Sequence, residues 1–210
     1  VREGMCADRR IGNQFLYPGL GYGGSCFPKD TLAVCSMGRQ VDEPCLLNEA
    51  VHTVNQNQRT WFWNKVIEEM GDDLSGKTIA FWGIAFKPRT DDIREAPAIA
   101  LMKRAIDAGA SVRAFDPEAA ANLRAEFPEV ETVDDVYDVL ADADALIVAT
   151  EWQEFRSPDF ERIGSLLREK LIFDGRNIYR RAMMEDLGFT YISVGRPAVR
   201  PPLRPPVQAS

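Results

Sequence analysis

The chain has little histidine and no long apolar run, and both shortages restrict what it can do. His52 is the single histidine among 210 residues, which leaves no material for a His/Cys zinc cluster and little for Ser-His-Asp or Cys-His catalysis. No stretch approaches the roughly 18 consecutive apolar residues of a membrane helix. A net charge of −7 disfavours nucleic acid, because binding the phosphate backbone requires surplus Lys and Arg. We therefore expect a soluble protein without a metal, a membrane or a nucleic acid as partner.

The four cysteines contain no C-x-x-C pair, and the sequence has no signal-peptide pattern. This pattern indicates free thiols in a reducing cytoplasm. The first residue is Val1 rather than Met, and a motif-rich stretch follows at once, so we expect the chain to belong to a longer protein.

The first part, residues 1–75, is predicted to be loop-rich and then helical. One helix is expected from Pro28 and a second, long one from Pro44 to a stop at Gly71. The adjacent aromatic residues 61–63 exceed what one face of a lone helix buries, so a second domain or a second subunit should cover them. The expected apolar stripe of the long helix consists of Leu47, Val51, Val54, Trp61, Val66 and Met70.

The second part, residues 76–195, alternates buried strands with helices of about 10 residues, which indicates an α/β fold with a parallel, Rossmann-like sheet and right-handed crossovers. A helix is also expected over residues 134–143. The third part, residues 196–210, is rich in proline and is predicted to be a mobile tail. The strands are expected within residues 77–83, 111–116, 130–133, 145–150, 170–175 and 189–195.

The stretch YPGLGYGGSCFPKD, residues 17–30, contains the spacing G-x-G-x-x-G. That spacing often binds a dinucleotide pyrophosphate, but the fingerprint requires a strand immediately before it. Here only QFLY precedes it, and Pro18 intervenes. The dinucleotide interpretation is therefore the weaker one.

A nucleophile in the same stretch is the stronger interpretation. Cys26 precedes the expected helix start, where the positive end of the helix dipole and nearby Lys29 favour a thiolate. Gly23 and Gly24 leave room for a substrate, and Asp30 is placed to position a water or relay a proton. The alternative is that Cys26 is an inert buried thiol. A cysteine hydrolase is disfavoured because a histidine partner is lacking.

Two further polar segments follow buried strands, at the sheet edge where open α/β sheets bind ligands. Residues 81–97 carry Lys87 and Arg94 toward a helix start, and residues 172–177 deliver Arg176. Cations beside a helix N-terminus suit a phosphorylated ligand. The alternative is a solvated charged loop.

Six motifs together resemble the UDP-glucose dehydrogenases within the UDP-glucose/GDP-mannose dehydrogenase family. The resemblance implies the end of a central helical dimerisation domain, followed by a sugar-nucleotide domain, without the N-terminal NAD-binding domain. The motifs, in chain order, are RIGNQFL, PGLGYGGSCFPKD, GIAFKPRTDDIREAP, AFDP, ATEW and FDGRN.

The implied reaction is the NAD-dependent oxidation of the C6 alcohol of UDP-glucose to UDP-glucuronate by a homodimer. The resemblance implies that Cys26 is the nucleophile, which carries a thiohemiacetal and then a thioester. It implies that Asp30 assists proton transfer or the hydrolytic water. Alternatives are oxidation of GDP-mannose or UDP-N-acetylmannosamine, or a module that binds sugar nucleotide and dimerises without chemistry; alone, the chain is expected to be inactive. The implied cofactor contacts are Cys26, Lys29 and Arg94. The implied substrate contacts are Arg10, Tyr17, Gly19, Gly21, Tyr22, Gly23, Phe86, Lys87 and Arg176.

Overall fold

A computed structural model describes residues 1–13 and 16–201. Its centre is a six-stranded sheet in the order β3-β2-β1-β4-β5-β6, and every neighbouring pair is parallel. This is a Rossmann-type order: β2 and β3 are added on one side of β1, and the strand order then reverses, with β4, β5 and β6 added on the other side. The α/β fold class expected from the sequence is confirmed. The strands are β1 (Thr78–Trp82), β2 (Ser111–Phe115), β3 (Glu131–Thr132), β4 (Ala145–Val148), β5 (Leu171–Asp174) and β6 (Thr190–Ser193).

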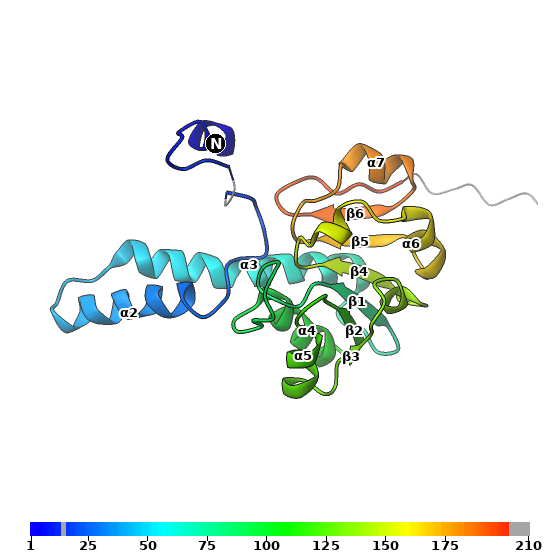
Figure 1. Cartoon of the computed structure of the whole chain (residues 1–210), viewed down its shortest axis with the longest axis horizontal. Coiled ribbons are helices and arrows are strands. Elements are labelled where there is room, and N and C mark those ends of the chain that lie inside the picture. The colour runs from blue at the N-terminus through cyan, green and yellow to red at the C-terminus, as the bar shows by residue number, and fades with distance from the viewer. Residues whose placement is uncertain (14–15, 202–210) are drawn as a thin grey trace, which may run out of the picture.

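Helices cover both faces of the sheet, as Figure 1 shows. Side chains alternate along a strand, so Ile79 and Phe81 of β1 enter one core while Ala80 and Trp82 enter the other. The first core is closed by α4 (Pro97–Asp107), α5 (Ala120–Glu126) and the C-terminal half of α3 (Leu46–Met70). The second is closed by α6 (Phe160–Leu166), α7 (Arg181–Asp186) and the 3₁₀ turns η1 (Asp138–Leu140) and η2 (Gln153–Arg156).

The helix expected over residues 134–143 is wrong, because only η1 forms there. Trp82 Nε1 donates to the carbonyl of Val136 over 2.8 Å, which holds this segment against β1. Burial of Val139 and Leu140 in the second core needs only one turn.

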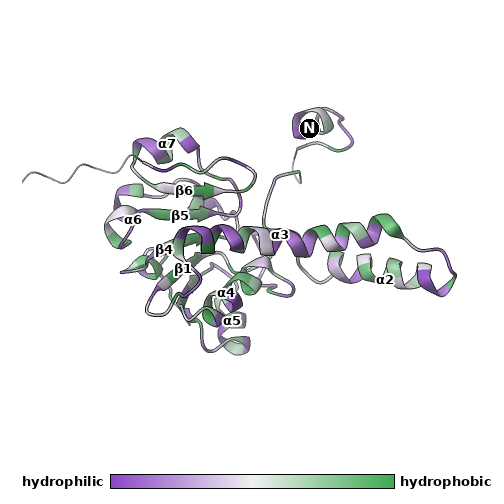
Figure 2. Ribbon diagram, turned by 180° about the vertical axis from the view of Figure 1, so that it is seen from behind, coloured by the Kyte–Doolittle hydropathy of each residue, from purple (hydrophilic) through white to green (hydrophobic). Residues whose placement is uncertain are grey.

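The N-terminal part contains α1 (Arg2–Cys6) and a helical hairpin of α2 (Phe27–Gln40) and α3, which projects from the α/β unit in Figures 1 and 2. The 25 residues of α3 end at Gly71, whose φ of +88° suits glycine. Its C-terminal half packs under the sheet through Phe62, Trp63 and Val66.

The single apolar stripe expected along α3 is wrong. Leu47, Val51 and Val54 are exposed on the projecting half, whereas Val66 and Met70 are buried under the sheet. One helix therefore presents apolar side chains to the α/β core in one half and leaves them uncovered in the other.

The segment expected to be a mobile tail begins with packed residues. Val199 is 5% exposed and pairs with Tyr191 of β6 through an antiparallel bridge, and Arg200 lies 2.7 Å from Glu69 of α3. Residues 202–210 lie outside the described part of the chain. Within the described part, no helix is long and apolar enough to cross a membrane.

Candidate functional site

The candidate site lies at the carboxyl edge of the sheet, around the reversal point between β1 and β4. Gly83, directly after β1, is so close to Thr150, after β4, that a methyl group would collide with the threonine side chain. Thr150 Oγ1 also donates to the carbonyl of Ala85 over 2.7 Å. These contacts fix the starts of the two loops that border the ligand crevice of such folds.

A buried aspartate after β2 holds the loop after β1. Asp116 Oδ2 accepts hydrogen bonds from the amides of Ile84 and Ala85, at 2.7 and 3.1 Å, and from Trp152 Nε1 at 3.1 Å. Asp116 belongs to the motif AFDP, but its role was not predicted from the sequence. The available signal was an aspartate placed directly after a buried strand.

Asp174, at the end of β5, holds the turn that carries Arg176 by accepting hydrogen bonds from its backbone amides. Its Oδ1 accepts from the Arg176 amide over 2.8 Å, and its Oδ2 accepts from Ile178, Tyr179 and the Tyr191 hydroxyl. The side chain is fully buried, and this burial raises the pKa of its carboxyl, while the four hydrogen bonds oppose that shift. The role of Asp174 was not predicted from the sequence either.

The glycine-rich stretch, residues 19–24, lies across these strand ends. Leu20 is buried against Gly175, where a methyl group would come within 2.6 Å of its side chain. Gly19 adjoins the guanidinium of Arg176, and Gly23 adjoins the carbonyl of Glu95. Segments far apart in sequence thus meet at one edge.

Gly24 closes the glycine-rich stretch onto the loop after β1. Its amide donates to the carbonyl of Arg94 over 2.8 Å, and a methyl group at Gly24 would lie 2.8 Å from the ring of Phe86. Two of the residues expected to contact ligand, Phe86 and Arg94, therefore border the stretch that leads to Cys26.

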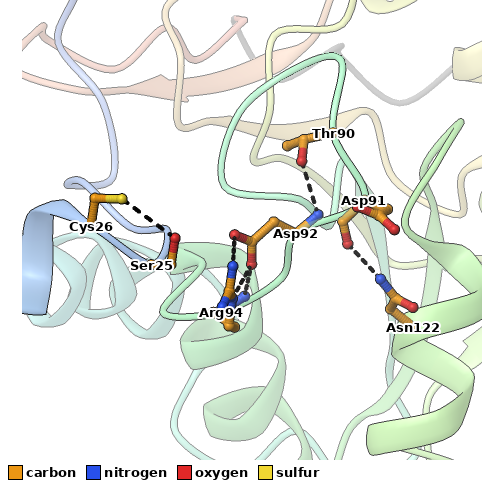
Figure 3. A network of polar contacts seen from close by, with 7 residues as sticks. All are labelled: Ser25, Cys26, Thr90, Asp91, Asp92, Arg94 and Asn122. Carbon is orange, nitrogen blue, oxygen red and sulfur yellow. Dashed lines mark hydrogen bonds and ion pairs between the residues drawn. The ribbon is translucent and has the colours of Figure 1, made fainter.

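Cys26 is the N-cap of α2, one residue before the helix begins. Its side chain is exposed, which contradicts the alternative of an inert buried thiol, whereas Cys35 is 2% exposed. Ser25 Oγ lies 3.6 Å from its Sγ (Figure 3). The thiol therefore faces solvent at the positive end of a helix of 14 residues.

Lys29 and Asp30, in the first turn of α2, form an exposed ion pair of 3.1 Å. The hydrogen bond with Asp30 raises the pKa of Lys29 above its usual value. The amide of Asp30 donates to the carbonyl of Cys26 over 2.8 Å, so the aspartate begins one helical turn from the thiol.

Arg94 is paired with Asp92 through two charge-assisted hydrogen bonds of 2.8 and 2.9 Å (Figure 3). This pairing raises the pKa of Arg94 and lowers that of Asp92. Lys87 is exposed, and its Nζ lies 5.2 Å from the centre of the Phe86 ring. Arg176, from the opposite loop, pairs with Glu151 after β4.

Two of the expected substrate contacts lie with the N-terminal segment instead. Arg10 pairs with Asp8 of its own segment, and the guanidinium of Arg2 lies 4.2 Å from the centre of the Tyr17 ring. Figure 1 shows α1 standing apart from the sheet. Within this chain, Arg10 is therefore not brought to the strand ends, and its expected contact to the substrate stays a prediction.

Comparison with known proteins agrees with this geometry. Residues 80–181 match the UDP binding domain, and residues 1–57 the central domain, of the UDP-glucose/GDP-mannose dehydrogenase family. The chain is 46% identical to the UDP-glucose 6-dehydrogenase of Rhizobium meliloti strain 1021 over 94% of its own length and 45% of the relative's. The enzyme of the same name from Pseudomonas aeruginosa is 43% identical, with the same coverage of both chains.

Solved structures are also similar. A UDP-glucose dehydrogenase from Pyrobaculum islandicum aligns with a TM-score of 0.75 and 34% identity, over 84% of this chain and 39% of that one. An NDP-N-acetyl-D-galactosaminuronic acid dehydrogenase from Methanosarcina mazei Go1 aligns with a TM-score of 0.76 and 27% identity, over 93% and 43%. The chain thus spans less than half the length of the relatives it matches. The matches to both family domains, together with the fold shared with solved dehydrogenases, show that the chain belongs to the UDP-glucose/GDP-mannose dehydrogenase family.

Proposed function

We propose that this chain holds UDP-glucose and supplies the nucleophile of a UDP-glucose 6-dehydrogenase. The observation that carries the proposal is the path of residues 19–26. The glycine-rich stretch crosses the ends of the parallel strands beside Arg176 and then delivers exposed Cys26 to the start of α2. The names of the two bacterial relatives support UDP-glucose as the substrate.

The diphosphate is proposed to bind Arg176 and Lys87, with backbone amides of the glycine-rich stretch as further donors. Guanidinium groups suit this task because their planar donors match phosphate oxygens. Gly19, Gly21 and Gly23 lack side chains, which lets the backbone of this stretch lie close to Arg176, Asn55 and the carbonyl of Glu95. Tyr22 and Phe86 are the proposed walls around the nucleotide sugar.

Cys26 is proposed to act on the aldehyde produced by the first oxidation at C6. Its thiolate attacks the carbonyl carbon and, with one proton, forms a thiohemiacetal that keeps the reactive aldehyde bound. Loss of a hydride from that carbon, and of the hydroxyl proton, gives a thioester. Water then cleaves the C–S bond, releasing the carboxylic acid and regenerating the thiol. Asp30, one helical turn away, is the proposed acceptor of the proton from that water.

NAD is the proposed oxidant, and when bound it would supply the hydride acceptor for each of the two oxidations. The loop after β1 carries Gly83 but neither further glycine of a dinucleotide fingerprint, so this sheet does not offer a pyrophosphate cradle of that kind. The groups that would reach the nicotinamide side are Cys26, Lys29 and Arg94, which are all exposed. We therefore expect the isolated chain to bind the sugar nucleotide without forming NADH, and sustained turnover by the chain alone would contradict this.

A second copy of the chain is the proposed partner of the projecting hairpin, which makes the protein a homodimer. Apolar residues, green in Figure 2, recur along both of its helices, and several of them are exposed, a pattern that marks interaction surfaces. We place the protein in the cytoplasm, where its four free cysteines stay reduced. The exposed apolar residues are Phe27, Leu32, Val34 and Met37 on α2, and Leu46, Leu47, Val51 and Val54 on α3.

The test is the alkylation rate of each cysteine by iodoacetamide, read by mass spectrometry with and without UDP-glucose. Cys26 should react fastest, and UDP-glucose should slow Cys26 alone, because Cys35 is buried and Cys6 and Cys45 are half-buried. Replacing UDP-glucose by GDP-mannose in the same experiment tests which sugar nucleotide the site prefers. Protection by GDP-mannose instead would favour that alternative substrate, and no protection by either would overturn the proposed site.

A further inference from the structure

Side chains from α3 hold the backbone of the glycine-rich stretch. Asn55 Oδ1 accepts from the amide of Tyr22 over 2.7 Å, and its Nδ2 donates to the carbonyl of the same residue over 3.1 Å. Gln58 Nε2 donates to the carbonyl of Gly19 over 2.8 Å. Two side chains one helical turn apart thus fix both ends of residues 19–22.

Arg59 ties this stretch to the loop after β1. Its Nη2 donates to the carbonyls of Tyr22 and Glu95, at 3.2 and 3.0 Å, and its Nη1 lies 3.5 Å from the Glu95 carboxylate. The arginine is only 7% exposed. Its buried charge is therefore directed at backbone oxygens of both loops that border the proposed site.

These residues continue the buried stripe of α3, on which Asn55 and Arg59 precede Phe62 and Val66 at helical spacing. Further along, that stripe is apolar and packs into the sheet's core. Burying polar groups costs free energy unless they are hydrogen-bonded, and asparagine is a poor helix former. Asn55 and Arg59 are polar at buried positions because they face backbone N–H and C=O groups of the glycine-rich stretch, with which they form hydrogen bonds.

The stretch itself has few means of keeping one shape. Gly21 has a φ of +107° and Gly24 of +86°, and a methyl group at Gly21 would lie 2.5 Å from Asn55 Oδ1. Glycine gives the chain more conformational freedom than any other residue, so an unrestrained stretch would sample many shapes. Contacts from α3 remove that freedom.

We propose that Asn55, Gln58 and Arg59 are positioning residues, which keep residues 19–24 in the shape that receives the nucleotide sugar and presents Cys26. They act through the loop backbone and not by contact with the reacting atoms. This inference rests on the proposed binding of UDP-glucose.

The test uses Asn55→Ala and Gln58→Ala in the full chain. The matched controls are Asn57→Ala and Gln56→Ala, which remove the same groups from exposed positions of the same helix. UDP-glucose affinity is measured by calorimetry, and amide hydrogen exchange is compared between residues 19–24 and the Phe62–Val66 turn of α3. The thermal unfolding midpoint reports global stability.

Both test variants should bind UDP-glucose about 3- to 10-fold more weakly, the loss expected for one hydrogen bond, while both controls bind like the unmodified chain. Exchange at residues 19–24 should accelerate by a similar factor, with exchange in the Phe62–Val66 turn unchanged. Asn55→Asp keeps the acceptor for the Tyr22 amide and should restore its slow exchange. A merely structural role would instead accelerate exchange in the helix and lower the unfolding midpoint.

Unchanged affinity in both test variants, with an unmodified chain that does bind UDP-glucose, would overturn the positioning role and leave the proposed function standing. An unmodified chain that does not bind UDP-glucose would overturn the proposed function, and this inference with it. Should Asn55→Ala fail to fold, Gln58→Ala decides, because Gln58 is only half-buried.

Discussion

Glu151 holds Arg176 with both carboxylate oxygens, Oε2 lying 2.6 Å from Nε and Oε1 2.7 Å from Nη2. The two side chains are only 24% and 21% exposed, so solvent screens the pair weakly. The contact leaves Nη1 of Arg176 beside Gly19, at the start of the glycine-rich stretch. An arginine held in this way is oriented before any ligand arrives.

Arg176→Ala should weaken UDP-glucose binding by about 1–3 kcal/mol, the usual range for a hydrogen bond to a charged group. Arg176→Lys should not restore the affinity, because an ammonium group cannot make the two-pronged contact with Glu151. Calorimetry measures both variants. Arg168→Ala is the control, since it removes a half-exposed guanidinium that precedes β5 at the opposite edge of the sheet. Equal losses at both positions would mean that net charge, and not this site, governs binding.

Asp174→Asn should lower the free energy of unfolding by at least about 1–3 kcal/mol. Whichever way the asparagine amide is turned, its nitrogen would face a donor that now meets carboxylate oxygen: the Arg176 amide on one side, or the Ile178 and Tyr179 amides and the Tyr191 hydroxyl on the other. Urea denaturation measures the change. Asp186→Asn, at the exposed end of α7, makes the same substitution and should leave stability within about 0.5 kcal/mol. A fully stable Asp174→Asn variant would show that the turn does not depend on this carboxylate.

The Arg94–Asp92 pair should contribute a pH-dependent part of stability. Because Arg94 lowers the pKa of Asp92, the contribution is present above the ordinary aspartate pKa of about 3.9 and is lost as the pH falls through the lowered value. Arg94 is 67% exposed, so we expect at most about 1 kcal/mol. The stability difference between the unmodified chain and Arg94→Ala should therefore shrink below about pH 4. Arg89→Ala, from the same loop, should give a difference that does not change with pH.

Val54→Glu should dissociate the proposed dimer, because it places a charge on a side chain that is 66% exposed in the apolar part of the hairpin. Gln56→Glu adds the same charge at an exposed, polar position of the same helix and should leave the dimer intact. Sedimentation velocity distinguishes the two outcomes. A Val54→Glu variant that still sediments as a dimer would move the interface to another surface.

Local pattern was enough to predict the sheet and most of its crossovers. Alternation of buried strands with short helices indicated β1, β2, β4, β5 and β6 within a few residues of their observed bounds, and Pro28 indicated the start of α2. Such signals lie within one element and do not depend on what packs against it. The prediction of a helix around η1 was wrong in a segment that contacts a distant residue, the Trp82 indole, and local pattern does not reveal such a contact.

Residues of the candidate site could be predicted only where the side chain is reactive or charged and its place in the local pattern is distinctive. Cys26 and Arg176 stand out in the sequence as a thiol before a helix and a cation after a strand. Asp116 and Asn55 do not, because their role lies in bonds to backbone groups more than thirty residues away. Composition and periodicity give no sign of such long-range partners.

The length of α3 has a mechanical consequence. Twenty-five residues make a rod of about 37 Å, which begins among the exposed apolar side chains of the hairpin and ends beneath the sheet. Asn55 and Arg59 sit near its middle, where the rod passes from one environment to the other. Because a helix is rigid, a displacement at the hairpin end of α3 would be transmitted to the glycine-rich stretch. Two chains paired through their hairpins would therefore also stabilise the proposed binding site in each chain.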